Sequence, residues 1–163
     1  MLSKKMLAEL NKQVNEELYS SYIYLSMAMW FEGKNLSGMA AWMKKQAGEE
    51  VEHADKFMSY INSRFGAVRL TAIEAPPFEW KSALDAFGAA YKHECHITGC
   101  IHKLVELARA ESDLPTENFL HWFVDEQVEE EEQTFVIVEK LKMVGDFPGA
   151  IFMLDSFLGK RAD

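Results

Sequence analysis

Apolar side chains recur along the chain every three or four residues, in four long stretches and one short one. This spacing places them on one face of an amphipathic α-helix. Glycine, proline, asparagine and aspartate interrupt the pattern between the stretches, as is usual where helices end. We therefore predict an all-α protein with helices over residues 4–33, 37–64, 81–110, 116–144 and 149–159.

The connection between the second and third predicted helices is unusually long. It covers residues 65–79 and contains Pro76 and Pro77, which prevent a helix there. A chain of about 15 extended residues reaches about 50 Å, and a helix of about 28 residues is about 42 Å long. The connection can therefore run back along a whole bundle, while the other connections are short and join antiparallel neighbours. We predict one domain, residues 1–163, formed by a four-helix bundle with a long crossover between helices two and three.

The short fifth helix, at the C-terminal end, is strongly apolar. A segment of this kind has to bury its surface, either against its own chain or within an assembly of many copies. Its apolar residues are Ala150, Ile151, Phe152, Leu154, Phe157 and Leu158.

Each of the four long apolar stripes is interrupted near its middle by side chains that can bind metals. Residues three apart lie on the same helix face, so a histidine and an amide share the stripe with two of the carboxylates. The interrupting residues are Glu17, Glu50 with His53, Glu94, and Gln127 with Glu130.

The middles of bundled helices meet at one level, whichever way each helix runs. Four carboxylates that converge there would be desolvated and would repel one another unless cations offset their charge. Oxygen-rich ligands with a single histidine suit iron or manganese, whereas structural zinc favours cysteine or more histidine. Any one glutamate could reflect a misread helix face, but four at one level favour a buried pair of metal ions. A structural bundle with lysine-paired carboxylates is the rival, and no lysine or arginine falls on the stripes at that level.

Other polar residues have two interpretations. Glu49, Glu126 and Glu129 flank the stripes and form either a third cation site or a solvated face. Tyr24 lies above Glu17 and is either a buried, hydrogen-bonded tyrosine or a residue with a catalytic role beside the metals. The remaining histidines fall off the stripes, and we predict that they lie on the surface: His93, His96, His102 and His121.

Composition narrows the function further. The formal charge of −9 disfavours a nucleic-acid surface. No apolar run approaches the roughly 20 residues of a membrane span, and no signal peptide is expected at the N-terminus. Cys95 and Cys100 are five apart and form no CxxC motif, which favours a reducing, cytoplasmic location.

The sequence resembles bacterial non-haem ferritin. Four stretches carry the resemblance, at residues 10–21, 48–53, 91–94 and 118–131. The resemblance implies that Fe(II) is oxidised by O2 or peroxide at a di-iron ferroxidase centre. It also implies iron storage and detoxification, with ferric oxyhydroxide held in a hollow homo-oligomeric 24-mer of octahedral symmetry.

The resemblance also implies individual roles. The first iron would be held by Glu17, Glu50 and His53. Glu50 would bridge to a second iron held by Glu94 and Glu130, with Gln127 close by. A third iron would use Glu49, Glu126, Glu129 and Glu130. Tyr24 matches the tyrosine beside the centre, and the short last helix matches the one that lines the four-fold axes.

Two departures separate the chain from its relatives. Val51 stands where bacterioferritin has its haem-ligating methionine, and helix four lacks a second Glu-x-x-His, so we expect no haem. Glu117 matches the first acidic residue of the three-fold channel in animal ferritins, but Leu120 replaces the second, so the resemblance does not imply the path by which iron enters.

The alternative function is a di-iron oxidase or oxygenase that acts on an organic substrate. Such a protein would form a much smaller particle.

Overall fold

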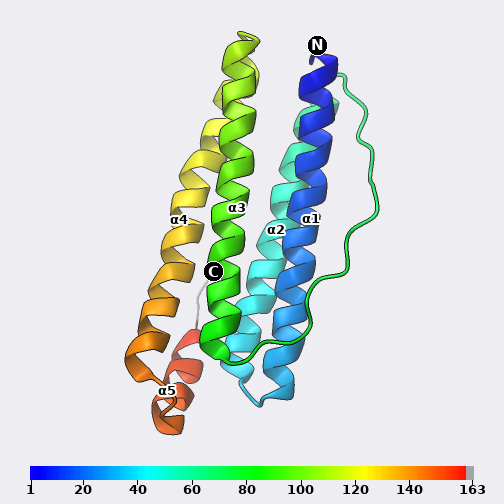
Figure 1. The fold of residues 1–163 in the computed structure, drawn as a ribbon. Coiled ribbons are helices and arrows are strands. Elements are labelled where there is room, and N and C mark those ends of the chain that lie inside the picture. The colour runs from blue at the N-terminus through cyan, green and yellow to red at the C-terminus, as the bar shows by residue number, and fades with distance from the viewer. Residues whose placement is uncertain (161–163) are drawn as a thin grey trace.

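The computed structural model describes residues 1–160 of the chain as a bundle of four long helices with a short fifth helix at one end (Figure 1). The elements are α1 (Lys4–Gly33), α2 (Ser37–Ser63), α3 (Ala83–Ala110), α4 (Leu114–Val144) and α5 (Pro148–Leu158). The predicted all-α fold is confirmed.

Three helix starts differ slightly from prediction, and capping side chains set two of them. The helix α3 begins at residue 83 and not 81, since the Ser82 hydroxyl accepts a hydrogen bond from the backbone N–H of Asp85 at 3.1 Å. The helix α4 begins at residue 114 and not 116, because Asp113 caps it and Pro115 is tolerated in the first turn. The helix α5 begins one residue early, with Pro148 in its first turn, and ends one residue early; α2 also ends one residue early.

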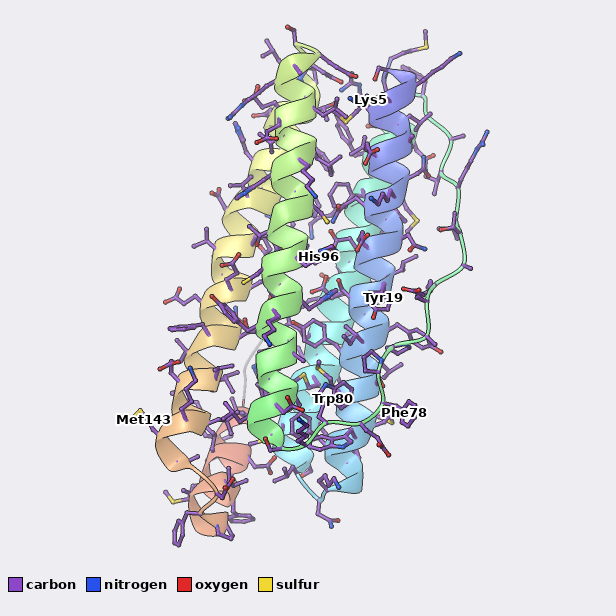
Figure 2. The ribbon with its side chains drawn as sticks, in the orientation of Figure 1. Lys5, Tyr19, Phe78, Trp80, His96 and Met143 are labelled. Carbon is purple, nitrogen blue, oxygen red and sulfur yellow. The ribbon has the colours of Figure 1, made fainter. Side chains whose placement is uncertain are left out.

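The long connection runs back along the outside of α1, so that α2 and α3 are parallel, as predicted (Figure 1). Polar side chains along α1 hold it in place. Asn11 Nδ2 donates to the carbonyl of Ala67 at 3.1 Å, Asn15 Nδ2 to Thr71 Oγ1 at 2.8 Å, and Ser26 Oγ to the carbonyl of Pro77 at 2.6 Å. The end of the connection is anchored by Trp80, whose ring meets that of Trp30 edge-on at 5.9 Å; Figure 2 shows Trp80 at the foot of the bundle.

Among residues 1–160, the buried apolar side chains form two clusters, one toward each end of the bundle. The chain order shows what separates them. On α1 the apolar residues up to Val14 belong to one cluster and those from Ile23 to the other. On α2 the division falls between Ala47, in one cluster, and Phe57, in the other. The middle layer between the clusters is the level at which the predicted ligands lie.

The helix α5 folds against its own chain at the end of the bundle where α2 begins. Its buried side chains include Leu154 and Leu158, while Phe152 and Met153 are 72 % and 73 % exposed. The first of the two predicted ways to bury this segment is therefore realised for one face of the helix. In the described part of the chain, no helix is long and apolar enough to cross a membrane.

Candidate metal centre

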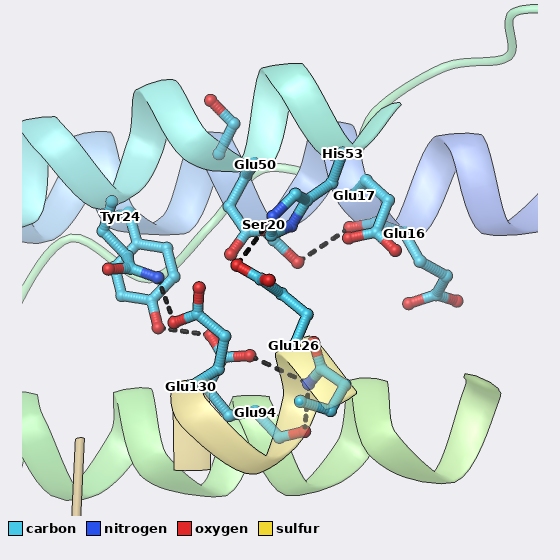
Figure 3. Close-up of polar contacts among 12 residues, drawn as sticks. Glu16, Glu17, Ser20, Tyr24, Glu50, His53, Glu94, Glu126 and Glu130 are labelled. Carbon is cyan, nitrogen blue, oxygen red and sulfur yellow. Dashed lines mark hydrogen bonds and ion pairs between the residues drawn. The ribbon is translucent and has the colours of Figure 1, made fainter. Parts of the chain in front are cut away.

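Four carboxylates from four different helices meet in the middle layer. Glu17, Glu50, Glu94 and Glu130 are each no more than 2 % exposed, and Figure 3 shows them converging. His53 and Gln127 are also buried, at 4 %. The structure thus brings together the residues that interrupt the apolar stripes.

On one side of this layer, α1 and α2 form a compact group. Carboxylate oxygens of Glu17 and Glu50 and a ring nitrogen of His53 all lie within 4.8 Å of one another. The His53 Nδ1 atom is 3.2 Å from Glu50 Oε2. Gln13 Nε2 donates to Glu17 Oε1 at 2.8 Å, whereas Oε2 of Glu17 is buried and has no hydrogen-bond partner among the described residues. A buried carboxylate oxygen without a partner is unusual and is suited to binding a cation.

On the other side, the carboxylates of α3 and α4 are held by neutral hydrogen-bond donors. The Tyr24 hydroxyl donates a short hydrogen bond to Glu94, and Gln127 Nε2 donates to Glu94 Oε2 at 3.2 Å. Gln46 Nε2 makes a short hydrogen bond to Glu130. These donors fix the orientation of both carboxylates but bring no positive charge.

The electrostatics of the layer are strongly unfavourable without a cation. No lysine or arginine is buried among residues 1–160. Burial, then the charge of Glu50, raises the pKa of Glu17 well above its ordinary value; burial, then Glu94 and Glu130, does the same for Glu50. Burial also raises the pKa of Glu94, and burial with the charge of Glu94 raises the pKa of Glu130 to about 8. The metal-free layer therefore retains protons that a cation would replace.

The flanking acidic residues are placed unequally. Glu126 Oε1 is 3.7 Å from His53 Nε2, and ligand atoms of Glu126, His53 and Glu130 lie within 4.8 Å of one another. Glu49 is half-buried, and its charge contributes to the raised pKa of Glu130. Glu129 is exposed and is not part of that group.

Two glutamines that sequence reasoning left without a role support the layer directly. Gln13 binds Glu17, and Gln46 binds Glu130. Gln13 precedes Glu17 by four residues, and this i, i+4 spacing was a usable signal. Gln46 lies on the core stripe of α2, but its partner is on α4, which spacing within one helix could not indicate.

The prediction that His93 is a surface residue was wrong. His93 is half-buried: its Nε2 atom lies 2.7 Å from Ser20 Oγ, and its ring meets that of Tyr19 edge-on. Burial, with a smaller contribution from His96, lowers the pKa of His93 to about 4, so it is neutral near pH 7. The other three histidines are exposed, as predicted: His96, His102 and His121.

Comparison with known proteins agrees with this geometry. A family profile described as a ferritin-like domain matches residues 7–144. The chain is 42 % identical to a bacterial non-heme ferritin of Bacteroides fragilis, over 99 % of this chain and 100 % of that one. It is 39 % identical to a bacterial non-heme ferritin of Campylobacter jejuni, over 97 % of this chain and 95 % of that one.

Solved structures agree as well. A ferritin from the archaeon Archaeoglobus fulgidus superimposes with a TM-score of 0.98 at 47 % identity, covering 99 % of this chain and 100 % of that one. Four helices that meet at a buried carboxylate layer, a family profile that spans most of the chain and full-length relatives above 30 % identity lead to one conclusion: this chain belongs to the ferritin family.

Proposed function

We propose that this chain oxidises Fe(II) at the mid-bundle carboxylates, and that assembled copies store the ferric product. The observation that carries the proposal is the set of four buried carboxylates with no buried lysine or arginine among residues 1–160. Such a layer is costly to bury unless cations bind to it. Membership of the ferritin family supports iron as that cation.

In this proposal two Fe(II) ions are the substrate. Glu17, Glu50 and His53 hold the first ion, and the oxygen of Glu17 that has no hydrogen-bond partner is available as a ligand for it. Glu50 bridges to the second, which Glu94 and Glu130 hold with Gln127 alongside. A donor set of carboxylate oxygens with one imidazole suits iron.

The proposed reaction is a balanced redox step. Two Fe(II) ions each lose one electron, and with two protons these convert O2 to hydrogen peroxide. The peroxide can oxidise two further Fe(II) ions, taking up two protons and forming two water molecules. The buried carboxyl groups release protons to solvent as iron replaces them. Tyr24 acts by orienting Glu94 through its hydrogen bond.

A third cation site extends the centre in this proposal, formed by Glu126 and Glu130 with Glu49 and Glu129 nearby. The contact between Glu126 and His53 supports it. We expect no haem, because Val51 offers no ligand atom at the position where bacterioferritin has a methionine.

We further propose that 24 copies form a hollow shell with octahedral symmetry, located in the cytoplasm. The exposed apolar face of α5, with Phe147, Phe152 and Phe157 between 59 % and 72 % exposed, supports burial against other copies. The Archaeoglobus fulgidus relative is described as an open pore ferritin, and a closed form of it has been engineered. Twenty-four chains of 18.7 kDa give a particle of about 450 kDa.

The test is Fe(II) titration of the metal-free protein, followed by ferric absorbance and by particle mass. We expect fast oxidation that first saturates at two or three irons per chain and then continues far beyond, on a particle of about 450 kDa. Glu94→Ala removes one ligand, and the initial rate should fall at least ~10-fold. Glu52→Ala, an exposed glutamate on α2, is the matched control and should leave the rate unchanged.

The contrary result is equally clear. If iron uptake stops at two or three ions per chain on a small particle, storage is excluded, and an oxidase acting on an organic substrate becomes the better assignment. If Glu94→Ala oxidises iron as fast as the unaltered chain, the centre has been misplaced.

A further inference from the structure

A second cluster of metal-binding side chains lies outside the carboxylate layer, between α1 and α3. His96 Nε2 is 3.2 Å from Glu16 Oε2 and 3.6 Å from Cys100 Sγ, and the three ligand atoms all lie within 4.8 Å of one another. Figure 3 shows Glu16 pointing away from the central carboxylates, and Figure 2 labels His96 midway along α3. The proposed iron chemistry uses none of these residues.

The helices bring these three side chains together by simple geometry. His96 and Cys100 are four residues apart on α3 and therefore share a face. Glu16 adjoins Glu17 on α1, and successive side chains on a helix point in different directions. Glu17 therefore faces the core, while Glu16 faces the space between α1 and α3. Cys95 is the matched contrast, since it is exposed on α3 and is not part of the cluster.

The two separations from His96 Nε2 are close to those of ligands around one tetrahedral ion. Bonds of about 2.05 Å to nitrogen, about 2.1 Å to oxygen and about 2.3 Å to sulfur place nitrogen and sulfur about 3.6 Å apart and nitrogen and oxygen about 3.4 Å apart. The corresponding distances here are 3.6 Å and 3.2 Å, both measured from His96 Nε2. A simple ion pair between His96 and Glu16 would not require that the Cys100 thiol also lie close to Nε2 of His96.

The surroundings allow an ion to enter from solvent. The side chain of His96 is 57 % exposed and that of Glu16 22 % exposed. Glu16 and Cys100 line a pocket of about 230 Å³, together with Lys5, Lys12 and Lys103. The lysine charges oppose a cation, so affinity has to come from direct coordination and not from long-range attraction. Burial raises the pKa of the Cys100 thiol, and a bound ion would displace that proton into solvent.

We propose that Glu16, His96 and Cys100 form a surface site for a borderline-soft divalent cation of the Zn²⁺ class, with water in the fourth position. Sulfur, nitrogen and oxygen donors with one open place are typical of such ions and differ from the all-oxygen-plus-imidazole set of the central layer. The site goes beyond the proposed iron oxidation and does not depend on it.

The test uses Co²⁺ as a spectroscopic probe on the metal-free, fully reduced, full-length protein without oxygen. We expect a thiolate-to-cobalt charge-transfer band in the near ultraviolet with tetrahedral visible bands, and we expect Zn²⁺ to displace it. Cys100→Ser should abolish the charge-transfer band, and Cys95→Ser should leave it intact. His96→Ala, at an exposed position that tolerates substitution, should weaken cobalt binding at least ~10-fold.

The variant Glu94→Ala, which alters the carboxylate layer, distinguishes cobalt binding at that layer from cobalt binding at the surface site. Co²⁺ bound only to carboxylates and imidazole gives no thiolate band, so the band should persist in Glu94→Ala. A band that is absent from the unaltered protein, or that survives Cys100→Ser, or that disappears in Cys95→Ser, would overturn the proposal. None of these results bears on whether the central layer oxidises iron.

Discussion

The carboxylate of Asp155, in α5, caps the first turn of α2 by accepting a hydrogen bond from the backbone N–H of Met39 at 2.8 Å. Its other oxygen accepts from the N–H of Gly38 at 3.1 Å. The residue that precedes α2, Leu36, makes no side-chain capping bond. Two of the free N–H groups at the start of α2 are thus satisfied from another helix, and α5 contributes directly to the stability of the bundle.

Asp155→Ala should destabilise the protein, because it leaves two buried N–H groups without partners and removes a charge that suits a helix N-terminus. We expect a loss of about 1–2 kcal/mol in the free energy of unfolding. Urea unfolding of the metal-free protein at fixed protein concentration measures it. Asp146→Ala, at an exposed site before α5, should change stability little; equal losses in both variants would argue against a capping role.

Gly38→Ala should separate α5 from α2. A Cβ atom at Gly38 would lie 1.8 Å from the carbonyl oxygen of Asp155, a backbone atom that cannot move away on its own. We expect a stability loss at least as large as that of Asp155→Ala. Gly48→Ala is the control, because a Cβ there meets nothing within 4 Å and should stabilise α2 by up to ~1 kcal/mol. If both glycine variants gain stability, the close approach of α5 is not as described.

The metal-free protein should lose stability as the pH rises. The carboxyl group of Glu130 has an ordinary pKa of 4.5, which burial and then Glu94 raise to about 8. Between these values the folded chain keeps a proton that the unfolded chain has lost. The stabilisation is therefore full below pH 4.5 and is lost as the pH rises to about 8, at up to ~1.4 kcal/mol per pH unit.

Glu130→Gln is the check on that pH dependence, since an amide has the same shape and does not titrate. Urea unfolding at several pH values should give a flatter profile for the variant than for the unaltered protein. A profile that rises from pH 5 to pH 8 in the unaltered metal-free protein would contradict the raised pKa.

The proposed third cation site should depend more on Glu126 than on Glu129. Glu126 lies 3.7 Å from His53 and groups with Glu130, whereas Glu129 is exposed and outside that group. We expect Glu126→Gln to lower iron binding from three ions per chain toward two, and Glu129→Gln to have the smaller effect. Anaerobic Fe(II) titration by calorimetry measures the number of ions bound by each variant. A larger effect of Glu129→Gln than of Glu126→Gln would show that α4 turns a different face toward His53.

Within each helix, the sequence contains much of the information needed for the centre. The carboxylates Glu17, Glu50, Glu94 and Glu130 each interrupt an apolar stripe, and the period of the α-helix converts their spacing into a common face. The level at which they meet follows from the similar lengths of the four long helices. The length of the crossover determines that α2 and α3 run parallel, because a shorter chain could not span the bundle.

Contacts between helices could not be predicted from the sequence in the same way. The spacing of residues indicates which helix face a side chain lies on, but not which residue of another helix lies opposite it. Packing decided that Gln46 of α2 binds Glu130 of α4, and that His93 is half-buried beside Ser20. Packing also decided which flanking glutamate faces His53.

The sequence by itself therefore determined the helices, their order along the bundle and the buried carboxylate layer, because each follows from local periodicity and chain length. Only the tertiary structure decided that Asp155 completes α2 across more than a hundred residues, and that Glu16 meets His96 and Cys100. Those relationships depend on the rotation and distance of packed helices, which are set by the fit of all their side chains together.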